Sequence, residues 1–274
     1  MTSPSTDSLL AVVDTWEVDH ASAALVGPDG VIAVAGDPHH VYALASVTKL
    51  LTSYGCLIAV EEQTLDLGSA VDPPGATVRH LLAHTAGYGF DDGIIGEPGR
   101  RRIYSNAGFE ALGQHLAERA QMPVGRYLAE AVVEPLGMSA TEIVDRSPAH
   151  GASSSLADIA RFARELLRPT LLSATTLRDA TTVQFEGLDG VLPGVGPQSP
   201  NDWGLGFELR GHKDPHWTGT TNSPETFGHF GGTGTFLWLD PTIDRALVVL
   251  TDREFGPWAL EAWPELSDAV VAAT

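Results

Sequence analysis

The order of hydrophobic and polar positions divides the chain into strand-like ends and a helical middle. Near the start, two apolar runs within residues 21–36 flank Pro28-Asp29-Gly30, a pattern typical of a β-hairpin. From Ser46 onward the apolar positions recur with helical spacing. Cap residues and stop signals predict three further helices, over residues 77–87, 106–120 and 153–167. Their expected N-caps are Thr77, Asn106 and the serines at the start of the third helix.

Beyond about residue 180 the chain is rich in glycine and proline and carries short β-like runs. These predict strands over residues 203–210, 226–230, 234–240 and 246–252, and then a closing helix over 257–273 that Pro264 could interrupt. A short amphipathic helix is also predicted over 8–18. Because strands flank a helical middle, we expect an α/β fold whose sheet is made from both ends of the chain, with an all-helical insertion. The predicted sheet domain comprises residues 1–50 and 168–274, and the helical domain comprises 51–167.

Composition and charge narrow the class of partner. The 274 residues are 43% hydrophobic, which is enough for a sizeable core, and the net charge of −19 disfavours nucleic acid and anionic membrane surfaces. No run reaches the roughly 18 uncharged apolar residues of a membrane span. The N-terminus lacks the basic and apolar regions of an export signal, and Cys56 has no second cysteine to pair with. We therefore expect a cytoplasmic protein, either a monomer or a weak homodimer, that acts on a small molecule.

The first candidate for chemistry is Ser46 with Lys49, one of only two lysines in the chain. At the start of a helix, a spacing of three residues puts both side chains on one face. A lysine kept neutral by burial and by the helix N-terminus can act as the base for a serine hydroxyl. By itself the pattern also fits a serine N-cap followed by a solvated lysine.

Two further segments carry polar groups that could join this pair. Tyr104 and Asn106 lie where a loop turns into a helix, so they could supply a proton-transfer phenol and an amide, or simply pack and cap. His229 lies in an apolar strand and is followed by Gly231 and Gly232, which would let another backbone or a substrate approach closely. On each segment alone, a packing role is the simpler explanation.

Together the three segments resemble the active-site motifs of the serine β-lactamase and penicillin-binding-protein superfamily. In that family the motifs run Ser-x-x-Lys, Tyr-x-Asn and Lys/His-x-Gly, and here they read SVTK (46–49), YSN (104–106) and HFG (229–231) in the same order. Framework segments such as LLAHTAG (81–87) and EPLGMSAT (134–141) extend the likeness over roughly residues 20 to 255. It is closest to the class C β-lactamases and to the esterases and D-amino-acid peptidases of that fold. The resemblance implies an antiparallel sheet flanked by helices, with the active site at the junction of the two domains.

The resemblance also implies a role for each residue of the motifs. Ser46 would be the acylated nucleophile, and Lys49 and Tyr104 would share its proton. Asn106, His229 and Gly231 would contact the substrate. The backbone N–H groups of Ser46 and Gly232 would form the oxyanion hole.

Three departures from the family pattern bear on the substrate. A histidine at 229 replaces the lysine that β-lactamases usually use for a substrate carboxylate, although it could still hydrogen-bond an ester or amide oxygen. The chain is short for the family, and an export signal is not evident. We therefore expect a serine hydrolase that favours esters, with a true β-lactamase or a D-amino-acid peptidase as alternatives, and a non-catalytic ligand-binding sensor as the alternative of another class.

Other signals are set aside. His80 and His84 have a spacing that can bind metal, but no third ligand is evident, so no metal or other cofactor is expected. The sequence has neither a G-x-S-x-G elbow nor a P-loop. Arg100, Arg101 and Arg102 are interpreted as a solvated loop, while Trp203 and Trp217 could border a pocket.

Overall fold

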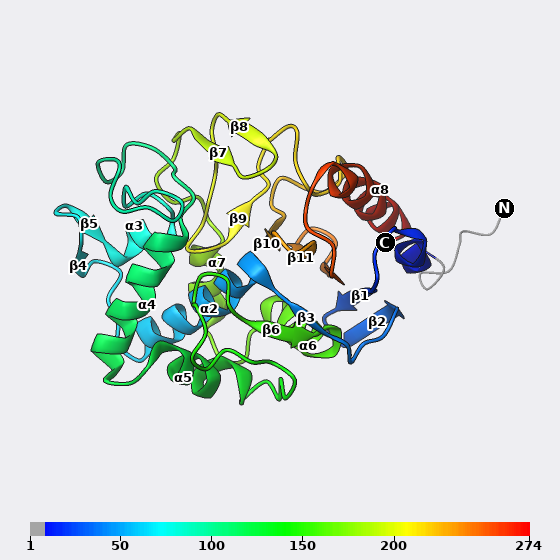
Figure 1. Cartoon of the computed structure of the whole chain (residues 1–274), viewed down its shortest axis with the longest axis horizontal. Coiled ribbons are helices and arrows are strands. Elements are labelled where there is room, and N and C mark those ends of the chain that lie inside the picture. The colour runs from blue at the N-terminus through cyan, green and yellow to red at the C-terminus, as the bar shows by residue number, and fades with distance from the viewer. Residues whose placement is uncertain (1–8) are drawn as a thin grey trace.

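The computed structural model describes residues 9–274, which fold around one six-stranded antiparallel sheet (Figure 1). Its strand order is β2-β1-β12-β11-β10-β9. The strands are β1 (Ala21–Gly27), β2 (Gly30–Ala35), β9 (Glu208–Leu209), β10 (Phe227–Gly231), β11 (Thr235–Asp240) and β12 (Arg245–Thr251). The α/β class and the sheet built from both chain ends are thus as the sequence predicts.

The centre of the sheet joins the two ends of the chain. β1 pairs with β2 in the predicted hairpin and with β12 on its other side, where Ala21 lies opposite Thr251 and Val26 opposite Ala246. β11 and β12 consist of nearly unbroken apolar residues that are buried on both faces. A strand buried on both faces needs a helical layer on each side.

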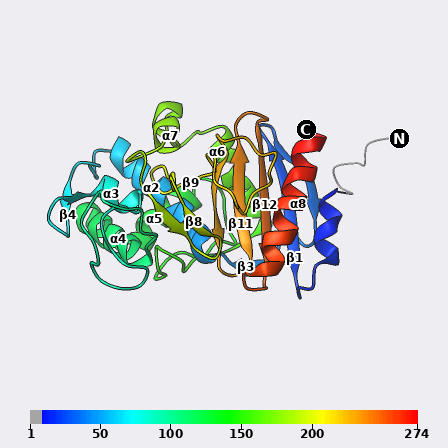
Figure 2. The ribbon, with the colours of Figure 1, turned by 90° about the horizontal axis from the view of Figure 1, so that it is seen from above.

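Those layers come from different parts of the chain (Figure 2). On one face, α8 (Pro257–Ala273) and the 3₁₀ turn η1 (Ala11–Thr15) pack over a core that includes Leu25, Trp238 and Val249. On the other face, α6 (Leu156–Leu167) packs against β1 and β12. The predicted domain division counts this helix in the helical domain, residues 51–167, although it contacts the sheet.

The helical part lies beside the sheet and is built around α2 (Thr48–Glu61), a helix buried along almost its whole length. The other helices are α3 (Val78–Leu82), α4 (Asn106–Ala120), α5 (Val124–Leu128), the π-helical turn η3 (Ala129–Val133) and α7 (Ala174–Ala180). Three two-stranded pairs complete the fold, namely β3 (Val41–Ala43) with β6 (Ser153–Ser155), β4 (Ala70–Val71) with β5 (Ala76–Thr77), and β7 (Gly190–Leu192) with β8 (Gly196–Gln198).

Several predicted boundaries are wrong. The helix predicted over 77–87 ends at Leu82, because His84 has a φ of 56° that no α-helix continues. The strand predicted over 203–210 shortens to two residues, and α8 runs through Pro264 without a break. The helix expected over 8–18 includes residue 8, which lies outside the described residues; within them Leu9 and Leu10 are α-helical and Ala11–Thr15 form a 3₁₀ turn. No helix within residues 9–274 is both long and apolar enough to span a membrane.

Candidate active site

Ser46 lies in a tight turn between the sheet and helix α2. The turn is the short 3₁₀ element η2 (Ala45–Val47), which runs directly into α2. Ala45 has a φ of 44°, a left-handed conformation that costs a non-glycine residue energy and often occurs at functional sites. Strand β10 presses on the turn, because a Cβ at Gly231 would lie 2.4 Å from Leu44 O and 3.2 Å from Ala45 Cβ. Gly231 therefore permits the close approach that fixes the Ser46 backbone.

Lys49 is completely buried one turn after Ser46, and each of its three polar neighbours can accept a hydrogen bond. Its Nζ lies 3.3 Å from Ser46 Oγ, 2.7 Å from Asn106 Oδ1 and 2.8 Å from Ala149 O. Burial lowers the pKa of Lys49 to about 7, while the carboxylates of Glu110 and Asp91 limit that drop. Near neutral pH a large fraction of this amine is therefore uncharged and has a lone pair.

Tyr104 contacts Ser46 from the other side. Its hydroxyl donates to Ser46 Oγ at 2.6 Å, and its ring packs among the rings of His84, Trp203 and His229. Burial raises the pKa of Tyr104, so the side chain stays a neutral phenol at physiological pH. The structure thus brings together the three residues that the sequence analysis assigned to catalysis.

Asn106 is placed by a cap that the sequence analysis assigned to the wrong residue. Ser105, not Asn106, is the N-cap of α4, and its Oγ accepts from Gly108 N at 2.8 Å. This leaves the Asn106 side chain free to accept from Lys49 and to donate to Asp91 at 2.8 Å. Both ends of its amide are therefore used within the protein.

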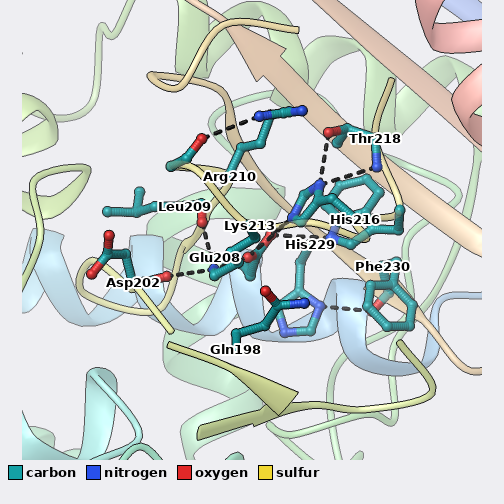
Figure 3. Close-up of polar contacts among 12 residues, drawn as sticks. Gln198, Asp202, Glu208, Leu209, Arg210, Lys213, His216, Thr218, His229 and Phe230 are labelled. Atoms are coloured by element: carbon teal, nitrogen blue, oxygen red, sulfur yellow. Dashed lines mark hydrogen bonds and ion pairs between the residues drawn. The ribbon is translucent and has the colours of Figure 1, made fainter. Parts of the chain in front are cut away.

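His229 is buried and neutral. Its Nδ1 lies 2.6 Å from Phe230 O, and because a carbonyl oxygen only accepts, Nδ1 carries the proton (Figure 3). Burial, helped by the nearby Lys49, lowers the pKa of His229 to about 3. The unprotonated Nε2 has no partner among the described residues and can only accept. The expectation that His229 hydrogen-bonds an ester oxygen is therefore wrong for this tautomer.

A cavity of about 160 Å³ opens beside Ser46. Its walls are mostly aromatic and aliphatic, and they consist of Ser46, Phe90, Tyr104, Leu192, Pro193, Gly194, Trp203, Glu208, His229, Phe230, Gly232 and Phe255. Gly232 lines the cavity where a Cβ would meet no atom within 4 Å. Gly231 and Asn106, which were expected to contact substrate, are not among the lining residues.

Comparison with known proteins decides the family. A family profile described as Beta-lactamase matches residues 19–271, nearly the whole chain. The chain belongs to the β-lactamase family. The predicted membership of the serine β-lactamase and penicillin-binding-protein superfamily is confirmed, and with it the assignment as an enzyme of the serine hydrolase type.

Individual relatives of this β-lactamase-family protein carry different names. A crystal structure of a β-lactamase from Mycobacterium bovis is 55% identical, with a TM-score of 0.95 over 97% of this chain and 98% of that one. A putative D-alanyl-D-alanine carboxypeptidase of Escherichia coli O157:H7 is 25% identical over 60% of this chain and 48% of its own length. The chain thus spans about half the length of the curated relatives it matches. EstCE1, a hydrolase with promiscuous acyltransferase activity, shares the fold at 16% identity, with a TM-score of 0.80 over 96% of this chain and 99% of that one.

A buried ionic cluster, which no local sequence pattern predicts, lies next to the β-lactamase-family motifs (Figure 3). The Glu208 carboxylate accepts from Lys213 Nζ, from His216 Nε2 at 3.0 Å and from Trp217 Nε1 at 3.0 Å. Burial raises the pKa of Glu208, but Lys213 and His216 together outweigh it and lower the value to about 2. Glu208 is therefore an anion in the cavity wall, and its charge is already paired with Lys213 and hydrogen-bonded by His216.

Arg102 and the two histidines of the set-aside signals are structural in this β-lactamase-family fold. Arg102 is 2% exposed and donates to the carbonyl oxygens of Ala83 and Asn201, so its interpretation as solvated is wrong. His80 closes the capping box of α3, and His84 is buried beside Tyr104. Among residues 9–274, no group of three or more His, Cys, Asp or Glu side chains is placed to hold a metal ion.

Proposed function

We propose that the protein hydrolyses short, neutral esters through an acyl-enzyme on Ser46. The carrying observation is the cavity beside this residue, because none of the described residues that line it is lysine or arginine. Among the described residues of these walls, a substrate carboxylate would find no cation, and the one charged side chain is the anion Glu208. Burying an unpaired carboxylate is costly, so the site favours an uncharged acyl group.

The size of the cavity supports a short acyl group. Pockets for drug-sized ligands measure about 300–1,000 Å³. A cavity of about 150 Å³ with apolar walls takes up benzene, so about 160 Å³ matches acyl chains of up to about six carbon atoms. The leaving alcohol would extend outward past Phe90, whose side chain is 49% exposed.

In the proposed first step, Ser46 Oγ attacks the acyl carbon and loses its proton to Lys49. Neutral Lys49 is the group suited to accept it, since its pKa is about 7 whereas the Tyr104 phenol is a far weaker acid than usual. The bond to the leaving oxygen then breaks, and the alcohol departs with the proton, which Lys49 returns directly or through the Tyr104 hydroxyl. A water molecule releases the acid by the same steps in reverse.

The developing negative charge on the carbonyl oxygen needs hydrogen-bond donors. We assign the backbone N–H groups of Ser46, which lies in η2, and of Gly232, which directly follows β10. Such donors stabilise the transition state by about 3–4 kcal/mol each in comparable sites. Their placement depends on the close packing of β10 against η2.

The test compares kcat/KM for p-nitrophenyl butyrate, a D-alanine amide and nitrocefin. We expect the ester to exceed nitrocefin by more than about tenfold, a difference of about 1.4 kcal/mol in transition-state binding. Ser46→Ala is the control and should lose both turnover and covalent labelling by a fluorophosphonate while it melts at the wild-type temperature. Read by intact mass, labelling also separates a hydrolase from a ligand-binding sensor.

Each other outcome points to a different function. Faster turnover of nitrocefin would assign β-lactamase activity, which the name of the 55% identical relative favours. Faster turnover of the D-alanine amide would assign a peptidase. A label on a serine other than Ser46 would overturn the assignment of Ser46 as the nucleophile.

A further inference from the structure

Asp91, a residue outside the family motifs, is linked to Lys49 through the side chain of Asn106. Its Oδ1 accepts from Asn106 Nδ2 at 2.8 Å, while Asn106 Oδ1 on the other side of the same amide accepts from Lys49 Nζ at 2.7 Å. A carboxylate only accepts, so it fixes which end of the amide faces which neighbour. We propose that Asp91 is a positioning residue whose contact with Asn106 turns the lone pair of Lys49 toward Ser46.

The reason lies in the hydrogen-bond count of a neutral amine. Uncharged Lys49 has two N–H donors and one lone pair, and it has three neighbours. Asn106 Oδ1 and Ala149 O can only accept, so they take both N–H groups. The lone pair is left for the Ser46 hydroxyl, the one neighbour that can donate.

A reversed amide would undo this arrangement. Asn106 would then present its NH₂ group to Lys49, and the lone pair would accept from that group instead of from Ser46. Ser46 would face an N–H and have no base. An amide can rotate by half a turn at little steric cost, so its orientation depends on its partners. Asp91 is the partner that opposes the reversed form.

The backbone holds Asp91 at this position. Phe90 O accepts from Asn106 N at 2.7 Å and from Ala107 N at 3.1 Å, while Gly89 O accepts from Ser105 Oγ at 2.6 Å. The loop before Asp91 thus covers the first turn of α4, the helix that begins with Asn106. An exposed aspartate is in this way kept beside a buried asparagine.

The charges near Lys49 give a second readout. Glu110 on α4 and Asp91 on the loop both raise its pKa, whereas His84 and His229 are buried and neutral and Tyr104 is a neutral phenol. Removal of either carboxylate should therefore lower the pKa of Lys49. The acidic limb of the pH profile, where Lys49 gains its proton, should move to lower pH.

The experiment compares four variants of the full chain by ester hydrolysis and by the rate of fluorophosphonate labelling. Asp91→Ala should lower the plateau kcat and the labelling rate by about tenfold, part of the 10²–10⁴-fold that a general base supplies, with KM within about twofold. Asp91→Asn removes the charge, and its amide can either accept from or donate to Asn106, so it should recover only part of the plateau, and its acidic limb should still move. Glu110→Gln should move the limb without lowering the plateau, and Asp92→Ala, on the same loop, should do neither.

This inference rests on the proposed role of Ser46, and the two can fail separately. If the wild type is labelled at Ser46 but Asp91→Ala keeps its plateau kcat and labelling rate within about twofold, the positioning role is overturned. If Glu110→Gln lowers the plateau as much as Asp91→Ala does, the lost charge and not the amide orientation is responsible, which also overturns it. If the wild type is not labelled at all, the proposed function fails and takes this inference with it.

Discussion

Lys49 carries a proton in acid and loses it near neutrality, because burial lowers its pKa to about 7. Below that pH the amine has no lone pair, so Ser46 has no base. We therefore predict that kcat/KM for a neutral ester rises with pH through an apparent pKa of about 7. A rate profile between about pH 5 and pH 9 measures it, and a flat profile would contradict the assignment of Lys49 as the base.

Replacing Lys49 by arginine separates base from charge. Arginine keeps the positive charge but cannot lose its proton in this range. We predict that Lys49→Arg is nearly as inactive as Lys49→Ala, with at least a 10²-fold loss of kcat for each. Circular dichroism of both variants serves as the control for folding. Arginine activity within tenfold of the wild type would show that Lys49 supplies only charge.

At the scale of single residues, the sequence predicts those catalytic candidates that belong to recognisable motifs. Ser46, Lys49 and Tyr104 are recognisable because their motif order is specific, and the structure brings their side chains together. The burial of Glu208 and Lys213 is not predictable in this way, since charged residues near a glycine-rich loop are typical of a solvated surface. Their burial depends on contacts between residues that no local pattern relates.

The contact between β10 and the nucleophile turn is where two elements set the geometry of the site. A Cβ at Gly231 would meet the backbone oxygen of Leu44 at 2.4 Å, whereas one at Gly232 would meet nothing within 4 Å. We predict that Gly231→Ala separates the elements, lowers stability by about 1–3 kcal/mol and abolishes most activity. Gly232→Ala is the matched control and should melt close to the wild type. Thermal melting with ester hydrolysis tests both, and an active Gly231→Ala would contradict the close packing.

At the scale of helices and strands, the sequence predicts the type of an element better than its first and last residues. The hairpin, the helices and β10 to β12 follow from period and turn residues. The early end of α3 follows instead from the left-handed backbone at His84, whose side chain is drawn into the aromatic cluster around Tyr104. A tertiary contact outweighs local helix preference there.

For the molecule as a whole, the buried cluster around Glu208 joins the short edge strand β9 to the loop that carries Lys213 and His216. Removing one partner from a buried ion pair leaves a charge without compensation. We predict that Lys213→Met lowers stability by about 3–5 kcal/mol. Adding Glu208→Gln to it should restore part of the loss. Both values come from denaturant unfolding.

An exposed ion pair provides the control for that measurement. Arg168 and Asp244 form one in which the side chains are 55% and 40% exposed. Arg168→Met should therefore lower stability far less than Lys213→Met does. Equal losses for Lys213→Met and Arg168→Met would show that burial adds nothing to the cluster.

The oligomeric state stays a prediction, a monomer or weak homodimer.

The pairing of β1 with β12 also bears on how the protein is made. Ala21 leaves the ribosome long before Thr251, its partner in the sheet, and at about 5–20 residues per second the gap lasts about 12–46 s. During that time β1 and β2 form at most an isolated hairpin, which is marginally stable in water. β10, which presses on the turn of Ser46, is also synthesised late. The nucleophile is thus kept from its reactive geometry until translation has nearly finished.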